Sequence, residues 1–395
     1  MQNSLIDPQT MKKTGLKISH VVSGIAMEAA GPSYTVPAMA LSQGQAGHDV
    51  TLHSLGAPVA PTDAPWHDLR YERDKTAIPA LQKLGKSRAL RAALEAGDSD
   101  VLHAHGLWQM PLIYAAQAAQ RSGKPLTVAP RGMLSPTAMQ VSRGRKKLFA
   151  LACQNKALDR VSMFHATAIS EYEEIRNHGL GQPVTIIPNG IDVRPARTLD
   201  RNRQTRTVLS LGRLHPHKGL NLLIRAWAQI EKAHPEWQLQ VIGPDQVGHK
   251  AELQKLAYAL NLKRVKVSEP VFGSQKWDTY AQADLFVLPS RSENFAVSVT
   301  EALAASVPVI SSKGAPWAGL QTHGCGWWID LEVSELAAAL NNAMYLDDAA
   351  RENMGARGRA WMMRDFSWPA IAGDMIASYR WLLEGGPPPP QVRLD

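Results

Sequence analysis

The chain has 395 residues, and at roughly 150 residues per domain this length favours two domains. Hydrophobic residues make up 45% and charged residues 20%, which is the balance of a globular protein with apolar material for two cores. This composition excludes a disordered chain, a collagen-like fibre and a disulfide-stapled miniprotein. The formal net charge of +8 favours anionic partners, such as nucleic acid, a membrane surface or a phosphorylated substrate.

Several features bear on the compartment of the protein. Two cysteines, Cys153 and Cys325, are too few for a disulfide framework. No run of about 18 apolar residues occurs, so we expect no membrane-spanning helix. Lys17 and His20 interrupt the first apolar stretch, which is therefore a poor signal peptide. We expect a cytoplasmic protein, and without zinc-finger spacing or an aromatic RNA-binding signature we expect no nucleic-acid partner.

Apolar segments of strand length alternate with amphipathic segments of helix length along almost the whole chain. Strands are predicted at 16–22, 49–53, 100–105, 126–129, 163–168, 184–187, 207–211, 238–242, 265–267, 284–289, 308–311 and 327–329. The helices predicted between the strands of the first half are 33–45, 81–95, 111–121 and 170–178. This alternation indicates βαβ units on parallel sheets, and each half has enough strands for a sheet of its own.

The boundary between the halves is predicted in the turn Ile187-Pro-Asn-Gly-Ile-Asp192, which a polar run follows. We therefore predict an α/β fold with two Rossmann-like parallel-sheet domains, 11–190 and 191–367, facing a central cleft. The last helix, 368–384, is expected to pack back on the N-terminal domain. The tail 385–395 contains four consecutive prolines and is expected to be disordered.

One candidate site begins where a strand ends in Gly212-Arg213 and a loop leads to Lys218-Gly219 at a helix start. Cations at the carboxyl end of a strand, beside free helix amides, are typical of a phosphate site, and two cations balance a diphosphate. The alternative is a pair of surface cations near a helix start. The glycine spacing is not that of a P-loop, which argues against a kinase or ATPase.

A second constellation follows the predicted strand 284–289, where a polar loop leads to a helix that Ser292 or Asn294 can cap. Glu293 lies at the helix start and Glu301 about two turns along it, so the two carboxylates project at different heights and do not form an acid–base pair. We expect both to accept hydrogen bonds from hydroxyl groups, Glu301 from a ribose and Glu293 from a sugar. The alternative is two solvated helix glutamates.

Three further features lie near strand ends of the first half. His103 and His105 point to one face of a strand; we interpret His103 as a hydrogen-bonded core residue and His105 as the functional candidate, and we assign no metal. Arg131 follows another buried strand, where it either binds an anionic group or fixes the loop. The loop that contains Gly31 lines the same side and lacks the GxGxxG pattern, which argues against NAD or FAD.

The motif Gly212-Arg213 with Lys218-Gly219, followed by Glu293 and Glu301, resembles the donor site of retaining glycosyltransferases of family four, of the bacterial surface-polysaccharide type. The flanking segments agree with this family, notably Ala283-Asp-Leu-Phe-Val-Leu-Pro-Ser. The resemblance covers roughly residues 16–380. Such enzymes have the GT-B fold, with an N-terminal acceptor domain and a C-terminal nucleotide-sugar donor domain.

The resemblance implies a role for each donor-site residue. Arg213 and Lys218, beside Gly212, would hold the donor's diphosphate, Glu301 would bind the ribose, and Glu293 would contact the donor sugar. Retention would proceed on one face of the sugar, with the leaving phosphate taking the acceptor's proton. No metal or other cofactor is expected, because cations and helix amides stabilise the leaving phosphate.

The resemblance also implies contacts for the base and for the loop. The base would lie against Val271 and Phe272, and the backbone around Asn294 and Phe295 would help to hold the sugar. Ala296 departs from the family, which usually has glycine after the aromatic residue.

The second departure concerns the N-terminal domain. Many relatives have a histidine where this chain has Arg131, so either Arg131 or His105 is expected to assist at the donor sugar. Gly31 and His105 are expected on the acceptor side of the site.

The acceptor is the least determined substrate. Two segments are rich in cations, and the second also has an apolar stripe of Leu148, Leu151 and Leu158. The cations are Lys83, Lys86, Arg88, Arg91, Arg143, Arg145, Lys146, Lys147, Lys156 and Arg160. Such a helix either lies on an anionic bilayer or packs by its apolar side.

We therefore expect the N-terminal domain to dock peripherally on the inner membrane. There it would extend a lipid-linked glycan for lipopolysaccharide, capsule or exopolysaccharide. The alternatives are a non-catalytic nucleotide-sugar binding protein, or an epimerase or phosphorylase with the GT-B fold. A dehydrogenase is the weakest alternative, since the glycine fingerprint is absent.

Overall fold

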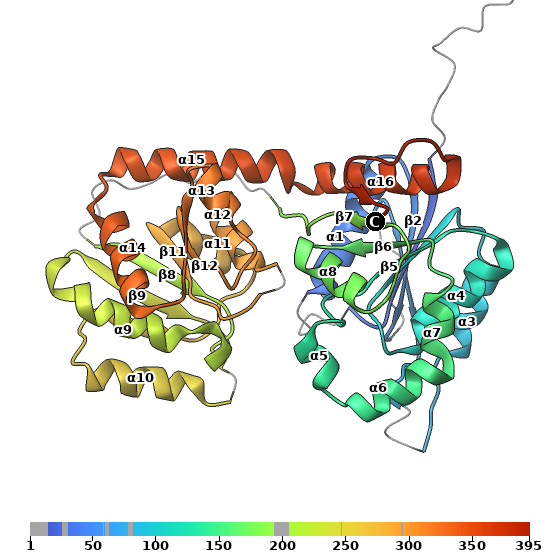
Figure 1. Ribbon diagram of the computed structural model, residues 1–395, viewed down its shortest axis with the longest axis horizontal. Coiled ribbons are helices and arrows are strands. Elements are labelled where there is room, and N and C mark those ends of the chain that lie inside the picture. Colours follow the sequence, from blue (N-terminus) through green and yellow to red (C-terminus); the bar gives the residue numbers. More distant parts are fainter. Residues whose placement is uncertain are drawn as a thin grey trace, which may run out of the picture. The chain divides into compact units, whose positions relative to one another are not determined.

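The computed structural model describes residues 15–25, 31–57, 59, 63–77, 82–192, 205–245, 247–293 and 295–395. The chain divides into two compact units, Met1–Ile187 with Ala372–Asp395 and Pro188–Ile371. Each unit contains one sheet covered by helices (Figure 1). The boundary between the units falls inside the predicted Ile187–Asp192 turn. No helix in the described part of the chain is both long and apolar enough to cross a bilayer.

The first unit is built on an eight-stranded sheet in the order β14-β7-β6-β5-β4-β1-β2-β3. Its strands are β1 Lys17–Val22, β2 Asp49–Leu55, β3 His67–Tyr71, β4 Val101–His105, β5 Leu126–Ala129, β6 Met163–Ala166, β7 Val184–Ile186 and β14 Val392–Arg393. All neighbouring strands are parallel except β14, which runs antiparallel to β7. The central strands β4, β5 and β6 are buried on both faces, and for this reason their sequences are mostly apolar. The polar side chains among them are buried as well, namely His103, His105, Thr127 and His165.

Helices cover both faces of this sheet (Figure 1). They are α1 Pro32–Gln45, α3 Arg88–Ala96, α4 Met110–Ser122, α5 Pro136–Gln140, α6 Arg143–Phe149, α7 Asn155–Leu158, α8 Ile169–Asn177 and α16 Trp368–Glu384. A π-helical turn, Ala150–Gln154, joins α6 to α7. Most of α4 is buried because small alanine side chains let the helix lie close to the sheet. Helix α16 begins at the end of the second unit, and from Ala372 it belongs to the first.

The second unit is built on a six-stranded sheet in the order β10-β9-β8-β11-β12-β13, with every neighbouring pair parallel. Its strands are β8 Arg206–Leu211, β9 Trp237–Ile242, β10 Val265–Ser268, β11 Leu285–Leu288, β12 Val309–Ser312 and β13 Gly326–Ile329. Its helices are α9 Leu220–Ile230, α10 His249–Ala259, α11 Gly273–Gln282, α12 Val297–Ala304, α13 Gly319–Thr322, α14 Val333–Tyr345 and α15 Asp348–Asp365. The two parallel sheets confirm the predicted α/β class.

The C-terminal tail differs from the sequence expectation. The prolines predict disorder for 385–395, but the structure places β14 from this tail on the edge of the first sheet, beside β7. The Tyr172 hydroxyl donates a hydrogen bond to the backbone oxygen of Asp395 at 2.9 Å. Proline prevents a helix and cannot donate to a ladder, but the residues that follow it can pair as an edge strand.

Two further elements differ from the prediction. The helix predicted over 81–95 is interrupted in its described part, because Gly85 has a φ of 66° and α3 begins only at Arg88. The Ser87 hydroxyl caps this helix by accepting from the backbone N–H of Leu90 at 3.2 Å. Strand β3 was not predicted because it lies at a sheet edge and its sequence, His-Asp-Leu-Arg-Tyr, is mostly polar.

Candidate active site

A pocket of about 490 Å³ lies in the second unit, where residues that follow β8, β9 and β10 meet α12. It brings together eight of the nine residues that the sequence assigns to donor binding, namely Gly212, Arg213, Lys218, Val271, Phe272, Glu293, Phe295 and Glu301. The ninth, Asn294, lies outside the described residues. Parallel strands end at the same edge of a sheet, so loops far apart in the sequence meet in this pocket.

The floor of the pocket depends on a close approach between two strand ends. Gly243 follows β9, and a Cβ atom at this position would lie 1.7 Å from the carbonyl oxygen of Gly212. Only glycine permits this contact. The backbone N–H of Leu214 then donates to the Pro244 carbonyl at 2.9 Å, which fixes the start of the loop that holds Arg213 and Lys218.

Lys218 and Glu293 form an ion pair in the pocket. Lys218 ends a short 3₁₀ turn and is followed by Gly219, whose left-handed φ of 64° begins α9. Glu293 is placed by its backbone N–H, which donates to the Gly314 carbonyl at 2.7 Å. The two side chains are 17% and 14% exposed, so the pair is mostly shielded from water.

Glu301 lies on α12 and is held by two residues that the sequence analysis did not identify. Lys276 donates to its Oε1 atom, and the Tyr280 hydroxyl donates to its Oε2 atom at 2.9 Å. Burial, and then the Glu301 carboxylate, raise the pKa of Tyr280 well above its usual value, so its hydroxyl keeps its proton. Lys276 and Tyr280 are four residues apart on α11, so their side chains lie on the same face of the helix.

Helix α12 begins differently from the prediction. Neither Ser292 nor Asn294 is its N-cap; the cap is Ala296, with a left-handed φ of 63° and no side-chain hydrogen bond. The chain therefore turns sharply after Phe295, and the predicted capping hydroxyl is not needed. This left-handed backbone conformation favours glycine, the residue that the resemblance implies at this position.

In the first unit, His105 and Arg131 meet in a buried chain of hydrogen bonds. The Arg131 guanidinium donates to His105 Nδ1 at 3.1 Å. His105 Nε2 therefore carries the ring proton and donates to His20 Nδ1 at 3.0 Å. His20 Nε2 in turn donates to the Gln43 side-chain oxygen at 2.7 Å.

A second chain of hydrogen bonds passes through His103. The carbonyl of Ile187 can only accept, so His165 Nε2 donates to it at 2.8 Å and His165 Nδ1 accepts from His103 Nε2 at 3.4 Å. His103 Nδ1 accepts from the Tyr379 hydroxyl of α16 at 2.6 Å. In this arrangement each of the four rings has one donating and one accepting nitrogen, which is the pattern of a neutral histidine.

Burial accounts for these protonation states. It lowers the pKa of His20 to about 4 and that of His165 to about 3. The pKa values of His103 and His105 are lowered well below 6.5, first by burial and then by neighbouring charges, including Arg131. Burial also lowers the pKa of Arg131 to about 10, which leaves the guanidinium charged at neutral pH.

The ring nitrogens of His20, His103 and His105 lie within 4.8 Å of one another, a separation that three metal ligands can have. A neutral imidazole binds a metal through its lone pair. In each of these rings the nitrogen with the lone pair accepts a hydrogen bond, and the charge of Arg131 lies beside His105. The donor set therefore does not suit a cation.

Gly31 and the loop after β5 complete the predicted positions. Gly31 is the exposed N-cap of α1 with a φ of 76°, and residues 26–30 before it lie outside the described part. Buried Glu171, which sequence reasoning missed, accepts from the backbone N–H groups of Gly132 at 2.6 Å and Thr167 at 2.7 Å. This carboxylate fixes the loop in which Arg131 lies.

Comparison with known families agrees with the resemblance. The family model described as "Glycosyl transferase 4-like domain" matches residues 30–190, and "Glycosyl transferases group 1" matches residues 196–361. Together the two models span most of both units. The chain belongs to the glycosyltransferases of the family-four type with the GT-B fold.

The sequence identity between this chain and individual relatives is low. The chain is 31% identical over 228 residues to a D-inositol 3-phosphate glycosyltransferase of Segniliparus rotundus; this match spans 52% of this chain and only 48% of the relative. It is 26% identical over 284 residues to a GDP-mannose:cellobiosyl-diphosphopolyprenol alpha-mannosyltransferase of Xanthomonas campestris, covering 71% and 74% of the two chains. The crystal structure of Anabaena Alr3699/HepE in complex with UDP and glucose has the same fold, with a TM-score of 0.67, 19% identity, and 91% and 98% of the chains covered.

Proposed function

We propose that this protein transfers a hexose from a nucleoside-diphosphate sugar to a glycan acceptor, with retention of configuration and without a metal ion. The observation that carries this proposal is the pocket in which Arg213 and Lys218 lie with Glu293 and Glu301. The name of the Xanthomonas relative includes a GDP-sugar, and the Anabaena structure holds UDP and glucose, which supports a nucleotide-sugar donor.

The charges of the pocket suit a diphosphate leaving group. Three cations line the described part of the pocket, Arg213, Lys218 and Lys276, against two carboxylates. A dianionic diphosphate therefore enters a site of net positive charge, in which fixed cations can stabilise the developing negative charge. The same cations would make a divalent metal unnecessary.

The pairing of both carboxylates supports retention on one face of the sugar. Glu293 is paired with Lys218 and Glu301 with Lys276, so each carboxylate already neutralises a cation. In a one-face reaction, the acceptor oxygen bonds to the anomeric carbon as the bond to the diphosphate breaks. The leaving phosphate takes the acceptor's proton, and no carboxylate nucleophile is required.

The donor proposal is tested by thermal shift with UDP, GDP, ADP and NAD, each with and without EDTA. We expect one nucleoside diphosphate to raise the melting temperature; at 100 times its dissociation constant the stabilisation is about 2.7 kcal/mol. EDTA should leave the shift unchanged, and Glu301→Ala should remove it. A response to NAD alone, or a response that EDTA removes, contradicts the proposal.

Transfer is distinguished from binding alone by Glu293→Ala. We expect this variant to lose transfer and to keep the nucleotide-induced shift, whereas Glu335→Ala, an exposed glutamate on α14, keeps both. Proton NMR of the product reports the anomeric configuration. An inverted product contradicts the retaining mechanism. If the wild-type protein binds a nucleotide sugar but transfers nothing to any glycan acceptor, the alternative of a non-catalytic binding protein is correct.

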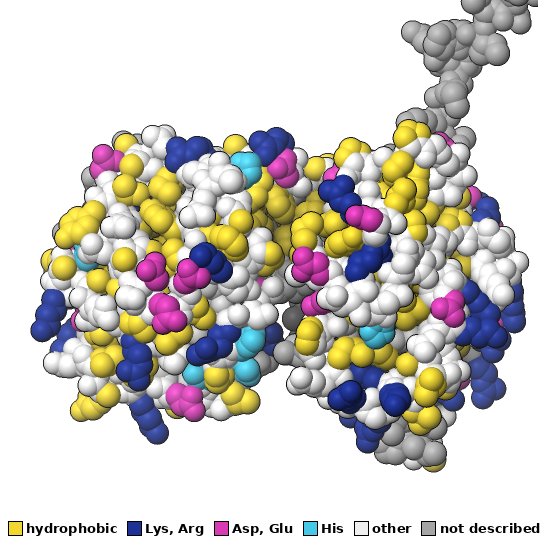
Figure 2. Space-filling model, in the orientation of Figure 1, with side chains coloured by type: hydrophobic (Ala, Val, Ile, Leu, Met, Phe, Trp, Pro, Cys, Tyr) yellow, Lys and Arg dark blue, Asp and Glu magenta, His cyan; other side chains and the backbone are white. Residues whose placement is uncertain are grey.

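We further propose that the acceptor is lipid-linked and that the first unit docks on an anionic bilayer. Of the predicted apolar stripe, Leu158 is buried in the core, but Leu148 and Leu151 are each 71% exposed. Figure 2 shows Lys and Arg side chains grouped at the lower end of the first unit, where α6 lies in Figure 1. Exposed leucines beside cations are the composition of an interfacial helix.

Liposome flotation tests the docking proposal. Wild-type protein should float with phosphatidylglycerol vesicles. With phosphatidylcholine vesicles it should stay at the bottom of the gradient. The double variant Leu148→Ser, Leu151→Ser should lose flotation, whereas Tyr345→Ser, which changes a 70% exposed aromatic residue of the second unit, should float normally. Flotation that does not depend on anionic lipid, or on the two leucines, rules the docking surface out.

A further inference from the structure

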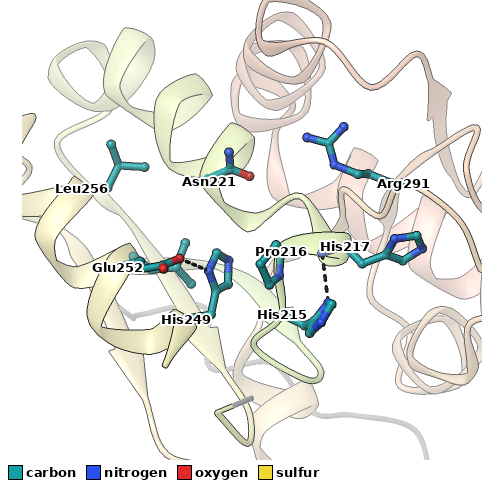
Figure 3. Close-up of a pocket in the computed structure, with 9 residues that line it drawn as sticks. His215, Pro216, His217, Asn221, His249, Glu252, Leu256 and Arg291 are labelled. Carbon is teal, nitrogen blue, oxygen red and sulfur yellow. Dashed lines mark hydrogen bonds and ion pairs between the residues drawn. The ribbon is translucent and has the colours of Figure 1, made fainter. Parts of the chain in front are cut away.

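A second pocket, of about 560 Å³, lies in the second unit between the 3₁₀ turn Pro216–Lys218 and the start of α10 (Figure 3). We call it the histidine pocket. Six of its lining residues enter the argument, Pro216, Asn221, His249, Leu253, Leu256 and Arg291. None of them was assigned a function from the sequence, and they do not line the pocket that contains Glu293 and Glu301.

The main feature of the histidine pocket is the pair formed by His249 and Glu252. The Glu252 carboxylate can only accept, so His249 Nδ1 carries a proton and donates to it at 2.7 Å. The His249 side chain is only 5% exposed, and its Nε2 atom has no hydrogen-bond partner in the described part of the chain. Buried polar atoms nearly always have a hydrogen-bond partner, and here the described residues supply none, so this nitrogen can accept a partner from a water or a ligand.

The other two histidines of the pocket hold the loop itself. His215 Nδ1 accepts from the backbone N–H of His217 at 3.2 Å. His217 Nε2 donates to the Ser292 carbonyl at 3.1 Å, and its ring points away from the other side chains in Figure 3. Of the three histidines, His249 is the one whose second ring nitrogen is buried without a hydrogen-bond partner among the described residues.

The remaining walls combine an apolar surface with polar groups. Pro216, Leu253 and Leu256 present apolar atoms, and in Figure 3 the His249 ring lies next to Pro216. The Arg291 guanidinium extends toward Asn221 on the other side of the pocket. An apolar surface with a few polar groups at its edge suits a pyranose ring, which has an apolar face and a rim of hydroxyl groups.

The chemistry of His249 favours a hydroxyl group over a phosphate. When its ring is neutral, Nε2 has a lone pair and needs a donor, which a sugar hydroxyl supplies. When the ring is protonated, the same hydroxyl can accept. The dianion of a phosphate ester offers acceptors alone, so it would satisfy only the protonated ring.

The histidine pocket shares a wall with the donor pocket. The backbone N–H of Arg291 donates to the His217 carbonyl at 2.9 Å, which joins the loop before α9 to the loop before α12. One side of this joined pair carries Lys218 and Glu293, and the other carries Pro216 and Arg291. A ligand in the histidine pocket therefore contacts the same two loops as the donor's diphosphate.

We propose that the histidine pocket is a second saccharide site, which binds a pyranose residue of the acceptor glycan through His249, Asn221 and Arg291. This inference rests on the proposed transferase function and extends it. The site would hold a part of the glycan that does not react, and so would contribute to the choice of acceptor.

The test is saturation-transfer NMR on the full chain with D-glucose and D-glucuronate as separate probes. We expect a signal in the wild type and in Glu293→Ala, loss of the signal in His249→Ala, and a reduced signal in Arg291→Ala. Gln254→Ala, an exposed polar residue of the same helix, is the matched control and should retain the full signal. Arg291 is exposed, so its variant should fold even if His249→Ala does not.

Three outcomes overturn the proposal. The first is no signal with either sugar. The second is a signal that Glu293→Ala removes and His249→Ala retains, which places the sugar in the donor pocket. The third is a shift of the His249 imidazole resonances with inorganic phosphate but with neither sugar, which makes the pocket an anion site. Saturation transfer reports binding and needs no catalytic turnover. If the protein shows no transferase activity but keeps the His249-dependent signal, only the transferase proposal is contradicted.

Discussion

Glu301 shows how this protein prepares a carboxylate for a ligand. The residue is 6% exposed, and a buried carboxylate is costly unless its oxygens are paired. Lys276 supplies charge on Oε1, and the Tyr280 hydroxyl supplies a hydrogen bond on Oε2. Both donors come from α11, so a single helix sets the position of the carboxylate before any nucleotide is present.

We predict that Tyr280→Phe weakens nucleotide binding about fivefold, because loss of a buried hydrogen bond costs about 1 kcal/mol and leaves Glu301 less well positioned. The free energy of unfolding should fall by a similar amount. Titration calorimetry and urea unfolding measure the two effects. Tyr258→Phe is the control, because Tyr258 is 86% exposed and should change neither quantity. Unchanged affinity in Tyr280→Phe would show that the hydrogen bond from Tyr280 does not position Glu301 for the nucleotide.

At the residue scale, the sequence predicted Arg213, Lys218, Glu293 and Glu301 as neighbours, and the structure brings them into one pocket. This was predictable because each follows a recognisable strand, and strand ends of a parallel sheet meet at one edge. Lys276 could not be predicted in the same way. Its contact with Glu301 joins two helices, and that contact depends on packing that no local pattern encodes.

At the scale of elements, the start of α12 stores strain. Ala296 has a left-handed φ of 63°, which costs an L-residue with a side chain about 1 kcal/mol. The turn places Phe295 against Trp317, whose indole N–H donates to the Phe295 carbonyl at 2.6 Å. The strain is therefore maintained by packing beside the pocket rather than by a capping side chain.

We predict that Ala296→Gly raises the free energy of unfolding by about 0.5 kcal/mol, the relief of left-handed strain less the entropy that glycine adds to the unfolded chain. The control is Ala356→Gly on the exposed side of α15, where the same substitution should cost about 1 kcal/mol. Urea unfolding of both variants measures the difference. Equal losses in the two variants would show that the turn carries no strain.

Elements were predictable where the chain is buried and periodic. The central strands β4, β5 and β6 are buried and mostly apolar and were found, whereas the polar edge strand β3 was not. β14 was missed for a different reason. Its two residues form a strand only because β7 offers an unpaired edge, and a tail of prolines gives no sign of that edge.

At the scale of the whole molecule, the two units differ in their histidines. Among the described residues, every buried histidine with a lowered pKa lies in the first unit. They are His20, His53, His103, His105 and His165. Burial is the largest cause of the lowered pKa in each. The neutral forms of His20, His103, His105 and His165 keep the two hydrogen-bond chains intact, so protonation acts on the folding of this unit as well as on its charge.

We predict that the first unit loses stability as the pH falls from about 6.5 toward 4. An unfolded histidine titrates near 6.5, but in the folded unit the pKa of His20 is about 4 and that of His165 about 3. In this interval the unfolded chain binds more protons, so each histidine lowers the free energy of unfolding by up to about 1.4 kcal/mol per pH unit. Above pH 6.5 both states are neutral and the effect vanishes.

Urea unfolding of the full chain at pH 7.5, 6.5 and 5.5, followed by circular dichroism, measures the slope of stability against pH. His165→Gln removes one of the titrating groups and should reduce this slope by about one histidine's contribution, whatever it does to the absolute stability. His178→Gln changes an exposed histidine of the same unit and should leave the slope unchanged. A free energy of unfolding that stays constant between pH 7.5 and 5.5 would mean that these rings have the same pKa in the folded protein as in the unfolded chain, and one that rises as the pH falls would mean that they are protonated in the folded protein.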